Sequence, residues 1–346
     1  MFKLRTHRTI ISVRRAWKKL ISTGCDTRSV YQSYWVNAAV KRRMPIYGFQ
    51  EKYSVRYLEL LEDGQTQMIL PVCKYRGTDR YCSVGKFNGF QVYDFIYSRE
   101  MTADKMRQCL SFVLQQLNVH KLSLLNVPHD SVLYSCLTET EAPVEGYQVT
   151  WGSNDNVCID TELNYESWHS KLSKSTRQNL RTAYNRMNTD GVSVEFEIKR
   201  AEKIKGKMLN EMIKLYCKRH SERYNVETSA LKKLYLRYLD FSTACLRSYP
   251  DNFYAAVYMN GQLAAFMSGL VEKEGSSAII PRLSIEDAFS KYSPGMVLIN
   301  ETVRSMSSDL GIRFLDLSKG AEKYKFSMGG QLHNTHNIEI TQTEDL

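Results

Sequence analysis

The sequence predicts an α/β (α+β) fold built from two tandem modules, each a mixed and mostly antiparallel sheet flanked by helices. Two stretches about 195 residues apart, SVRYLELLEDGQTQMILPV (54–72) and FYAAVYMNGQLAAFMSGL (253–270), share one pattern. Each has an apolar stretch, then Asp-Gly-Gln or Asn-Gly-Gln, then a second apolar stretch, which is a strong β-hairpin signal. Downstream, residues 106–127 and 298–317 both read as an amphipathic helix, a stop residue and a short buried strand.

The length and the charge distribution suggest three parts. A chain of 346 residues has room for two domains of ordinary size. Residues 1–43 hold eleven Lys or Arg and only one acid, so the whole net charge of +10 lies there. We predict a basic N-terminal arm (1–43), a degenerate first module (44–150) and a catalytic second module (151–346). The arm would bind tRNA or an anionic membrane surface and would not contribute to folding, with a solvated helix as the alternative.

Several classes of protein are disfavoured by composition. No apolar stretch reaches the roughly 18–20 residues needed to cross a bilayer, and basic residues interrupt every apolar patch near the start. The eight cysteines are scattered without a C-x-x-C pair. His333 and His336 are three apart on a predicted strand, hence on opposite faces, which argues against a shared metal. We expect a cytoplasmic protein, or one peripheral to the inner face of the membrane, without a metal.

The second half can be divided further by periodicity. Helices are predicted at 163–172, 176–188, 202–220, 228–240 and 321–326, and strands at 192–198, 277–283, 313–317 and 332–340. A bulge or a splay in the strand at 277–283 would expose backbone groups with which the arm of a cofactor could pair.

A turn before the helix in KYSPGMVLINETVRSM (291–306) predicts an anion site. Ser293 suits an N-cap, Pro294 suits the first turn, and Gly295 leaves the backbone accessible. N–H groups at a helix start lack intrahelical partners and attract anions, although an ordinary turn is the alternative. In the first module, Glu100 and Asp104 would repel a phosphate, so we place the site in the second. The predicted donors are the N–H groups of Gly295, Met296, Val297 and Leu298.

Four segments of the second half share the features of one known group of enzymes. They are LSKSTRQNLRTAYNRM (172–187), LYCKRHSERY (215–224), FSKYSPGMVLINETV (289–303) and FLDLSKGAEKYKFSMG (314–329). They resemble the GNAT acyltransferases, specifically the tandem branch with the cellulose-biosynthesis-type acetyltransferases and the Fem-type peptidoglycan aminoacyl transferases. The likeness runs from about residue 30 to residue 340, and its specific motifs lie in the second half.

This resemblance implies two GNAT-like domains, with acyl-CoA, most simply acetyl-CoA, as the donor. The acyl group would go to an amine or hydroxyl of a small molecule or glycan precursor: a sugar, an amino acid or a cell-envelope or polysaccharide precursor. One alternative is a Fem-type enzyme that uses aminoacyl-tRNA, which would explain the basic arm. The other is a non-catalytic module that only binds a ligand.

Catalytic residues are expected near the last strands. Asp316 lies on a predicted strand, where it would be a general base or a substrate clamp, or else a cap for the following helix. In the family's logic, Tyr324 would protonate the leaving thiolate, and Lys325 would hold a phosphate or a developing negative charge. The alternative for both is a solvated surface helix. Tyr292, beside the turn, is a candidate for substrate binding.

Two basic clusters on predicted helices complete the candidate substrate site. Arg177 and Arg181 are one helical turn apart, behind a predicted capping box that starts at Ser175. Arg219, His220 and Arg223 form the second cluster, in which His220 could serve as a base because of its pKa range. A plain solvated face is the alternative for both clusters.

Overall fold

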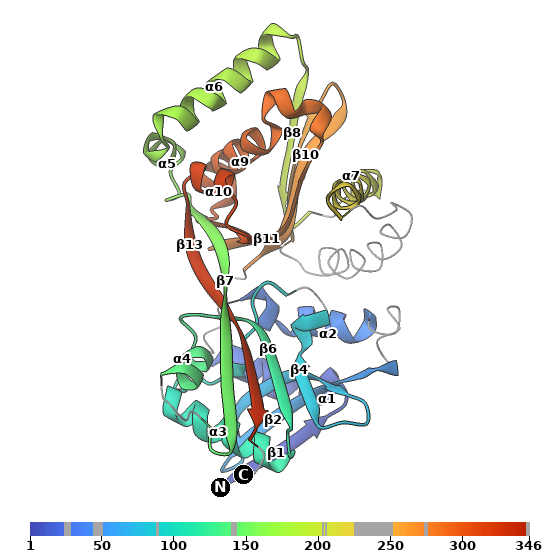
Figure 1. The fold of residues 1–346 in the computed structure, drawn as a ribbon, viewed down its shortest axis with the longest axis vertical. Helices are drawn as coiled ribbons and strands as arrows, with labels where there is room; N and C mark the ends of the chain where they lie inside the picture. Colours follow the sequence, from blue (N-terminus) through green and yellow to red (C-terminus); the bar gives the residue numbers. More distant parts are fainter. Residues whose placement is uncertain are drawn as a thin grey trace. The chain divides into compact units, whose positions relative to one another are not determined.

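The computed structural model describes residues 1–23, 29–43, 51–87, 90–139, 144–202, 204, 206–224, 252–272 and 276–343. The chain divides into two compact units: unit 1 is Met1–Asn154 with Asn334–Leu346, and unit 2 is Asp155–His333. Figure 1 shows that each unit has a sheet with helices beside it. The helix predicted at 228–240 lies outside the described residues. None of the helices that the structure describes combines the length and the apolar composition needed to span a bilayer.

Unit 1 contains the first hairpin. Its strands are β1 (Phe2–His7), β2 (Tyr53–Glu62), β3 (Gln65–Tyr75), β4 (Arg80–Ser83), β5 (Ile96–Tyr97), β6 (Lys121–Pro128) and part of β13 (Gly330–Gln342). Its helices include α1 (Ile10–Ser22), α2 (Tyr34–Arg43), α3 (Ala103–Gln116) and α4 (Val132–Thr138). The strand order is β1-β2-β3-β4-β6-β13, and β4 with β6 is the parallel pair.

Unit 2 contains the second hairpin. Its strands are part of β7 (Tyr147–Asp160), β8 (Val194–Arg200), β9 (Asn252–Met259), β10 (Gln262–Val271), β11 (Ser277–Ile285) and β12 (Phe314–Lys319). Its helices include α5 (Tyr165–Lys171), α6 (Lys174–Thr189), α7 (Gly206–Tyr224), α9 (Pro294–Ser305) and α10 (Lys323–Ser327). The strand order is β8-β9-β10-β11-β12-β7, and β11 with β12 is the parallel pair.

The two strand orders are the same, so the predicted repeat is confirmed. The β2–β3 turn has Asp63 at φ 49° and Gly64 at 80°, and the β9–β10 turn has Asn260 at 51° and Gly261 at 72°. Both turns therefore use the left-handed backbone that a two-residue hairpin requires. In both units the hairpin leads to a third strand, which pairs in parallel with the strand that follows α3 or α9.

Each unit completes its sheet with a strand from elsewhere in the sequence. β7 follows β6 along the chain, but it pairs with β12 in unit 2. β13 follows β12, but it pairs with β6 in unit 1, from Thr335↔Pro128 to Thr341↔Lys121. Unit 1 therefore contains a C-terminal segment that a single division near residue 150 would assign to the other unit.

Residues near the N-terminus belong to the folded core of unit 1. β1 pairs with β2 from Phe2↔Glu62 to His7↔Tyr57. On α1, Trp17 is 0% exposed, and its indole N–H donates to the carbonyl of Gln32 at 3.1 Å. The expectation that residues 1–43 do not contribute to folding is therefore wrong for β1 and α1. The apolar period that was missed is formed by Ile10, Val13, Trp17 and Leu20, which are all buried.

One face of the unit 2 sheet packs in the apolar core, and the opposite face carries polar side chains. Ala278, Leu315 and Ile159 are fully buried in the apolar core against α9. Because successive strand residues point to opposite faces, their neighbours Ile279 and Asp316, which are register partners, point the other way. β12 therefore alternates between the two faces of the sheet, and Asp316 lies on the face opposite the core.

Candidate active site

A gap in strand pairing opens one edge of β11. β11 and β12 pair over three positions only, Ser277–Ile279 with Phe314–Asp316. Farther along, β11 pairs with β10, and β12 pairs with β7. In the part of the chain that the structure describes, no strand covers the β12 side of β11 from Ile280 to Ile285. The predicted splay is therefore confirmed, and it leaves backbone N–H and C=O groups available to a ligand.

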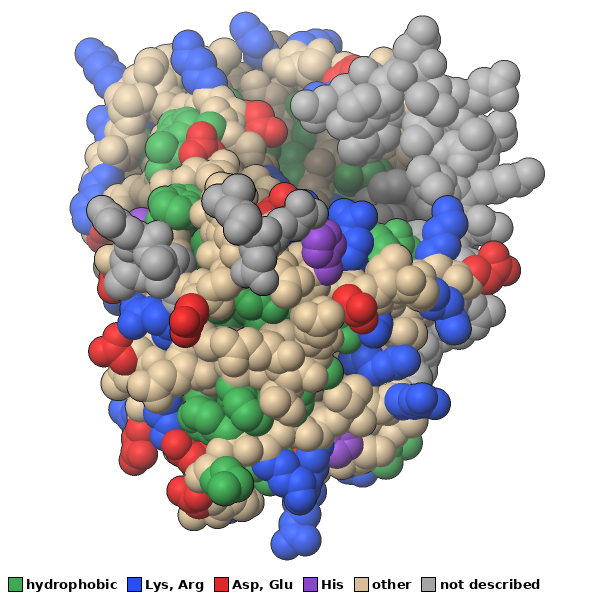
Figure 2. Space-filling view, turned by 60° about the horizontal axis from the view of Figure 1, so that its bottom comes forward, with side chains coloured by type: hydrophobic (Ala, Val, Ile, Leu, Met, Phe, Trp, Pro, Cys, Tyr) green, Lys and Arg blue, Asp and Glu red, His purple; other side chains and the backbone are tan. Residues whose placement is uncertain are grey.

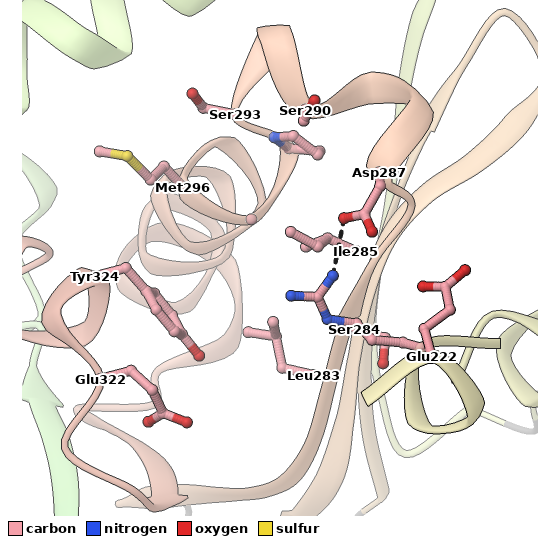
Figure 3. A pocket seen from close by; sticks show the side chains of 13 residues that line it. Glu222, Leu283, Ser284, Ile285, Asp287, Ser290, Ser293, Met296, Glu322 and Tyr324 are labelled. Atoms are coloured by element: carbon pink, nitrogen blue, oxygen red, sulfur yellow. Dashed lines mark hydrogen bonds and ion pairs between the residues drawn. The ribbon is translucent and has the colours of Figure 1, made fainter. Parts of the chain in front are cut away.

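A cavity of about 820 Å³ lies beside this open edge (Figure 3). It is lined from β11, from the 3₁₀ helix Asp287–Tyr292, from the start of α9, and from α7 and the α10 region. Figure 3 shows Ser290 and Ser293 at one end of the cavity, and Glu322 with Tyr324 at the other. A cavity of this size suits a cofactor or substrate of several hundred daltons.

Tyr324 presents its hydroxyl to the cavity. Its ring extends from α10 toward Leu283 of β11 (Figure 3). The hydroxyl has no hydrogen-bond partner among the described residues. Burial, and then the Glu322 carboxylate, raise the pKa of Tyr324 from 10.0 to about 12. The phenol therefore stays protonated at neutral pH and can donate its proton to a ligand.

Lys325 does not face the cavity, which corrects its predicted role. Its side chain is buried, with 3% exposed, and its ammonium also lies 3.0 Å from Oε2 of Glu322. An ammonium has three protons. Glu322 and the four loop carbonyl oxygens named below accept them, so none is left for a ligand. Lys325 instead fixes the loop between β12 and α10. Its Nζ donates to the carbonyl oxygens of Leu317 at 3.0 Å, Ser318 at 3.3 Å, Lys319 at 2.8 Å and Gly320 at 2.9 Å.

Asp316 is buried, with 7% exposed, and it is not among the residues that line the cavity. Its Oδ1 accepts the N–H of Ser318 at 2.7 Å, and its Oδ2 lies 3.3 Å from Nε2 of His333. The alternative role as a helix cap is wrong, because the N-cap of α10 is Glu322. The role as a base stays a prediction. The sequence offered no signal for the pairing with His333, which comes from a separate strand.

The start of α9 offers fewer donors than predicted. Ser293 is the N-cap residue, but its side chain makes no capping bond and its φ is 49°. Its carbonyl accepts the N–H groups of Met296 at 3.0 Å and Val297 at 3.1 Å. Two of the four predicted donors are thus already used. The side chains of Val297 and Leu298 are fully buried in the core and do not line the cavity.

A smaller anion subsite remains where the start of α9 borders the cavity. Gly295 lines it, and its N–H has no partner among the described residues. The hydroxyls of Ser290 and Ser293 line the same end and can donate as well. A Cβ added at Gly295 would lie 3.2 Å from Cγ2 of Ile285, so the bare backbone keeps this passage open.

The charged side chains of the lining are mostly acidic. Arg219 lines the cavity, where its guanidinium is paired with Asp287 at 2.9 Å, and its role in substrate binding stays a prediction. Glu222 and Glu322 add two more carboxylates. Sequence reasoning missed these acids because they lie in polar segments that look like ordinary surface. Asp287 is paired with Arg219 and Glu322 with Lys325, so Glu222 is the lining carboxylate without an ion pair among the described residues, and it favours a cationic group in the cavity.

The first basic cluster has a local structural role. Arg177 donates to the carbonyls of Ser170 at 2.6 Å and Leu172 at 2.5 Å, where α5 ends. The N-cap of α6 is Ser173 rather than the predicted Ser175. Arg177 therefore joins the end of α5 to the start of α6 and does not line the cavity, which corrects its predicted substrate role.

Three further predicted residues lie elsewhere. Tyr292 is buried, and its hydroxyl donates to Oδ2 of Asp190 at 2.8 Å, so it is a core residue and does not line the cavity. Arg181 is exposed on α6, also away from the lining. His220 lies on α7, but its side chain is outside the described residues. No group of three His, Cys, Asp or Glu side chains is close enough to hold a metal within the described ranges.

Comparison with known proteins supports this reading of the fold. Residues 174–326, somewhat less than half of the chain, match the family described as the acetyltransferase (GNAT) domain. A tandem GNAT protein from the clavulanic acid biosynthesis pathway superposes with a TM-score of 0.57 at 8% identity, covering 100% of both chains. No curated protein sequence matches this chain.

Two further solved structures, whose names do not mention GNAT, have the same fold. FemX superposes with a TM-score of 0.54 at 10% identity, covering 97% of this chain and 96% of its own. The C-terminal domain of a protein described as a lysylphosphatidylglycerol synthetase from Agrobacterium fabrum gives 0.54 at 10% identity, covering 97% and 93%. At these identities the likeness is one of fold, and that fold is the tandem GNAT arrangement. None of the three structures is named as a cellulose-biosynthesis-type acetyltransferase, so that branch stays a prediction.

Proposed function

We propose that the protein is an acyltransferase that moves an acyl group, most simply acetyl, from a CoA thioester to a primary amine in the cavity of unit 2. The observation that carries the proposal is the Tyr324 hydroxyl, which is protonated, has no partner among the described residues and faces the cavity beside the open edge of β11. The match of residues 174–326 to the acetyltransferase domain supports the same reaction class.

The donor would lie along β11. Its amide groups can pair with the uncovered backbone between Ile280 and Ile285, as an added strand would. Its diphosphate would then reach the N–H of Gly295 and the hydroxyls of Ser290 and Ser293. This orientation brings the thioester toward Leu283 and Tyr324, at the other end of the cavity (Figure 3).

The acids of the lining favour an amine over a hydroxyl as the acceptor. An amine arrives as an ammonium ion, which the Glu222 carboxylate attracts, and it must lose a proton before it can attack. The amine nitrogen then bonds to the carbonyl carbon, the C–S bond breaks, and the thiolate takes the proton of the Tyr324 hydroxyl. The nitrogen loses a second proton as the amide forms. Both protons of the amine pass to solvent, from which Tyr324 is reprotonated. Amino sugars, amino acids and amine-bearing envelope precursors are the acceptors to test first.

Release of free thiol from acetyl-CoA, measured over a panel of amines and matched alcohols, tests this proposal. Tyr324→Phe should lower kcat about 100-fold or more, with little change in the KM for acetyl-CoA, because loss of a general acid affects the chemical step. The matched control is Tyr292→Phe, which removes a hydroxyl outside the cavity. It should keep kcat within a few-fold.

A thermal-shift comparison separates the alternatives. A donor at about 100 times its Kd stabilises the protein by roughly 2.7 kcal/mol, which is easily seen as a rise in Tm. Stabilisation by acetyl-CoA without turnover would indicate a binding module. Stabilisation by aminoacyl-tRNA alone would indicate the Fem-type donor and would overturn the proposal.

A further inference from the structure

The exposed side of α1 carries cations that lack acidic partners. Arg14, Arg15, Lys18 and Lys19 are all exposed, and none forms an ion pair within the described ranges. Some cations elsewhere in unit 1 do have acidic partners, since Lys74 lies 3.0 Å from a carboxylate oxygen of Asp79 and Lys121 lies 2.6 Å from one of Glu339. The positive charge of α1 is therefore left for a ligand outside the chain.

An apolar side chain is exposed among these cations. Ile11 has 76% of its surface exposed, although α1 buries its other face in the core. Arg14, Arg15 and Lys18 follow Ile11 by three, four and seven positions, which puts them on the same side of the helix. Exposure of a large aliphatic side chain inside a basic cluster needs an explanation that charge alone does not give.

A tryptophan on α2 extends this surface. The guanidinium of Arg14 lies 5.8 Å from the ring centre of Tyr34, and the Tyr34 ring lies 5.7 Å from that of Trp35. Trp35 is 53% exposed, so the buried Tyr34 ring links Arg14 to an exposed aromatic side chain. Figure 2 shows one face of the molecule, on which Lys and Arg side chains project beside Asp, Glu and hydrophobic side chains. We use the name α1 face for the surface formed by Ile11, Arg14, Arg15, Lys18, Lys19 and Trp35.

We propose that the α1 face binds the surface of a bilayer that contains anionic phospholipids. Guanidinium and ammonium groups pair with the headgroup phosphates, while Ile11 and Trp35 enter the boundary between headgroups and acyl chains. A nucleic acid would use the cations and could stack on Trp35, but it would leave the exposed aliphatic Ile11 without a role. This inference does not depend on the proposed acyl transfer, because it concerns a surface that the reaction does not use.

Vesicle flotation of the full chain tests the proposal. Binding should be strong to phosphatidylcholine vesicles that contain phosphatidylglycerol, weak to pure phosphatidylcholine, and reduced by salt. Arg15→Gln with Lys18→Gln should weaken the partition coefficient roughly 10- to 30-fold, since each cation near an anionic surface contributes about a factor of five. The control, Lys207→Gln with Lys214→Gln, removes the same charge from exposed positions on α7 and should change partitioning less than about two-fold.

Ile11→Ser and Trp35→Phe report on the apolar part of the contact. Ile11→Ser should lower partitioning several-fold while leaving the thermal melt unchanged, because the side chain is exposed. Vesicles should shift the tryptophan fluorescence to shorter wavelength. Trp35→Phe should abolish this shift, whereas Trp151→Phe, at a 50% exposed site on β7, should keep it.

Two results would overturn the proposal. One is equal partitioning of the Arg15→Gln/Lys18→Gln variant and its α7 control. The other is binding of folded RNA at a lower phosphate concentration than vesicles, with loss of RNA binding in the same variant and no effect of Ile11→Ser. That second result would identify the α1 face as a nucleic-acid site.

Discussion

The Nζ atom of Lys325 lies 2.8 Å from the carbonyl oxygen of Lys319, and it donates to three further carbonyls of the same loop. A buried ammonium with four carbonyl acceptors holds the chain between β12 and α10 in one conformation. The preceding residue in the sequence is Tyr324, which lies on α10 and owes its position at the cavity to this loop.

Replacing Lys325 should destabilise the loop between β12 and α10. Lys325→Met keeps the length of the side chain but leaves the carbonyls without a donor, which should lower the free energy of unfolding by roughly 2–4 kcal/mol. Under the proposed function kcat should also fall, because Tyr324 loses its support. Urea denaturation and the thiol-release assay measure the two effects. Lys323→Met, at an exposed position on the same helix, is the control, and an equal loss in both variants would contradict this role.

A substitution at Gly295 tests the anion subsite. Gly295→Glu puts bulk beside Ile285 and a negative charge at the predicted diphosphate position. Loss of one charge-assisted hydrogen bond, at about 1.5–3 kcal/mol, predicts an affinity for acetyl-CoA that is roughly 10- to 150-fold lower. Calorimetry measures the Kd. Gly206→Glu, where an added Cβ meets nothing within 4 Å, should bind as the wild type does. Equal affinities for all three proteins would mean that the start of α9 is only a turn.

The buried His336 predicts a pH dependence of stability. Burial, and then the neighbouring His129, hold the pKa of His336 below its ordinary value of 6.5. The folded state thus favours the neutral ring, so the free energy of unfolding should fall as the pH drops through 6.5 toward the lower folded value. His336→Asn should flatten the plot of Tm against pH in this range. His120→Asn, at an exposed site, should leave the slope unchanged, and a slope unaffected by His336→Asn would contradict the assignment.

Two substitutions on α1 separate its buried side from its exposed side. Trp17→Ala empties a fully buried site and should lower the free energy of unfolding by roughly 3–5 kcal/mol. Ile11→Ala, at a position that is 76% exposed, should change it by less than about 0.5 kcal/mol. Chemical denaturation of both variants decides whether residues near the N-terminus stabilise unit 1. A small effect of Trp17→Ala would restore the view of this segment as a separate arm.

Local signals predicted most of the architecture. Asp63-Gly64 and Asn260-Gly261 adopt the positive φ angles that their hairpins require, and Asn118 and Gly311 end their helices in the same backbone region. These residues act through their own backbone preferences, so neighbouring sequence is enough to recognise them. The position of α1 was missed because the cations around Trp17 suggested an exposed segment, although the buried residues keep a helical period.

Predicting which side chains face the cavity would have required contacts that the local sequence does not determine. Tyr324 lines the cavity and its catalytic role stays a prediction, whereas the ammonium of Lys325 is used by four carbonyl oxygens of its own loop. Arg177 likewise pairs with carbonyls nearby, and Asp316 meets His333 only through the fold. Which polar group faces a ligand and which is used internally is decided by packing, and residue type alone leaves both outcomes open.

Because β7 pairs with β12 and β13 pairs with β6, neither half of the chain can complete its sheet without a strand from the other half. After a duplication, a copy cut near residue 150 would leave β6 without β13, and a second half lacking β7 would leave β12 with a bare edge. Bare strand edges recruit other chains and aggregate. Whatever chemistry the first half has, the second half therefore needs its strand to keep a closed sheet and to stay in solution.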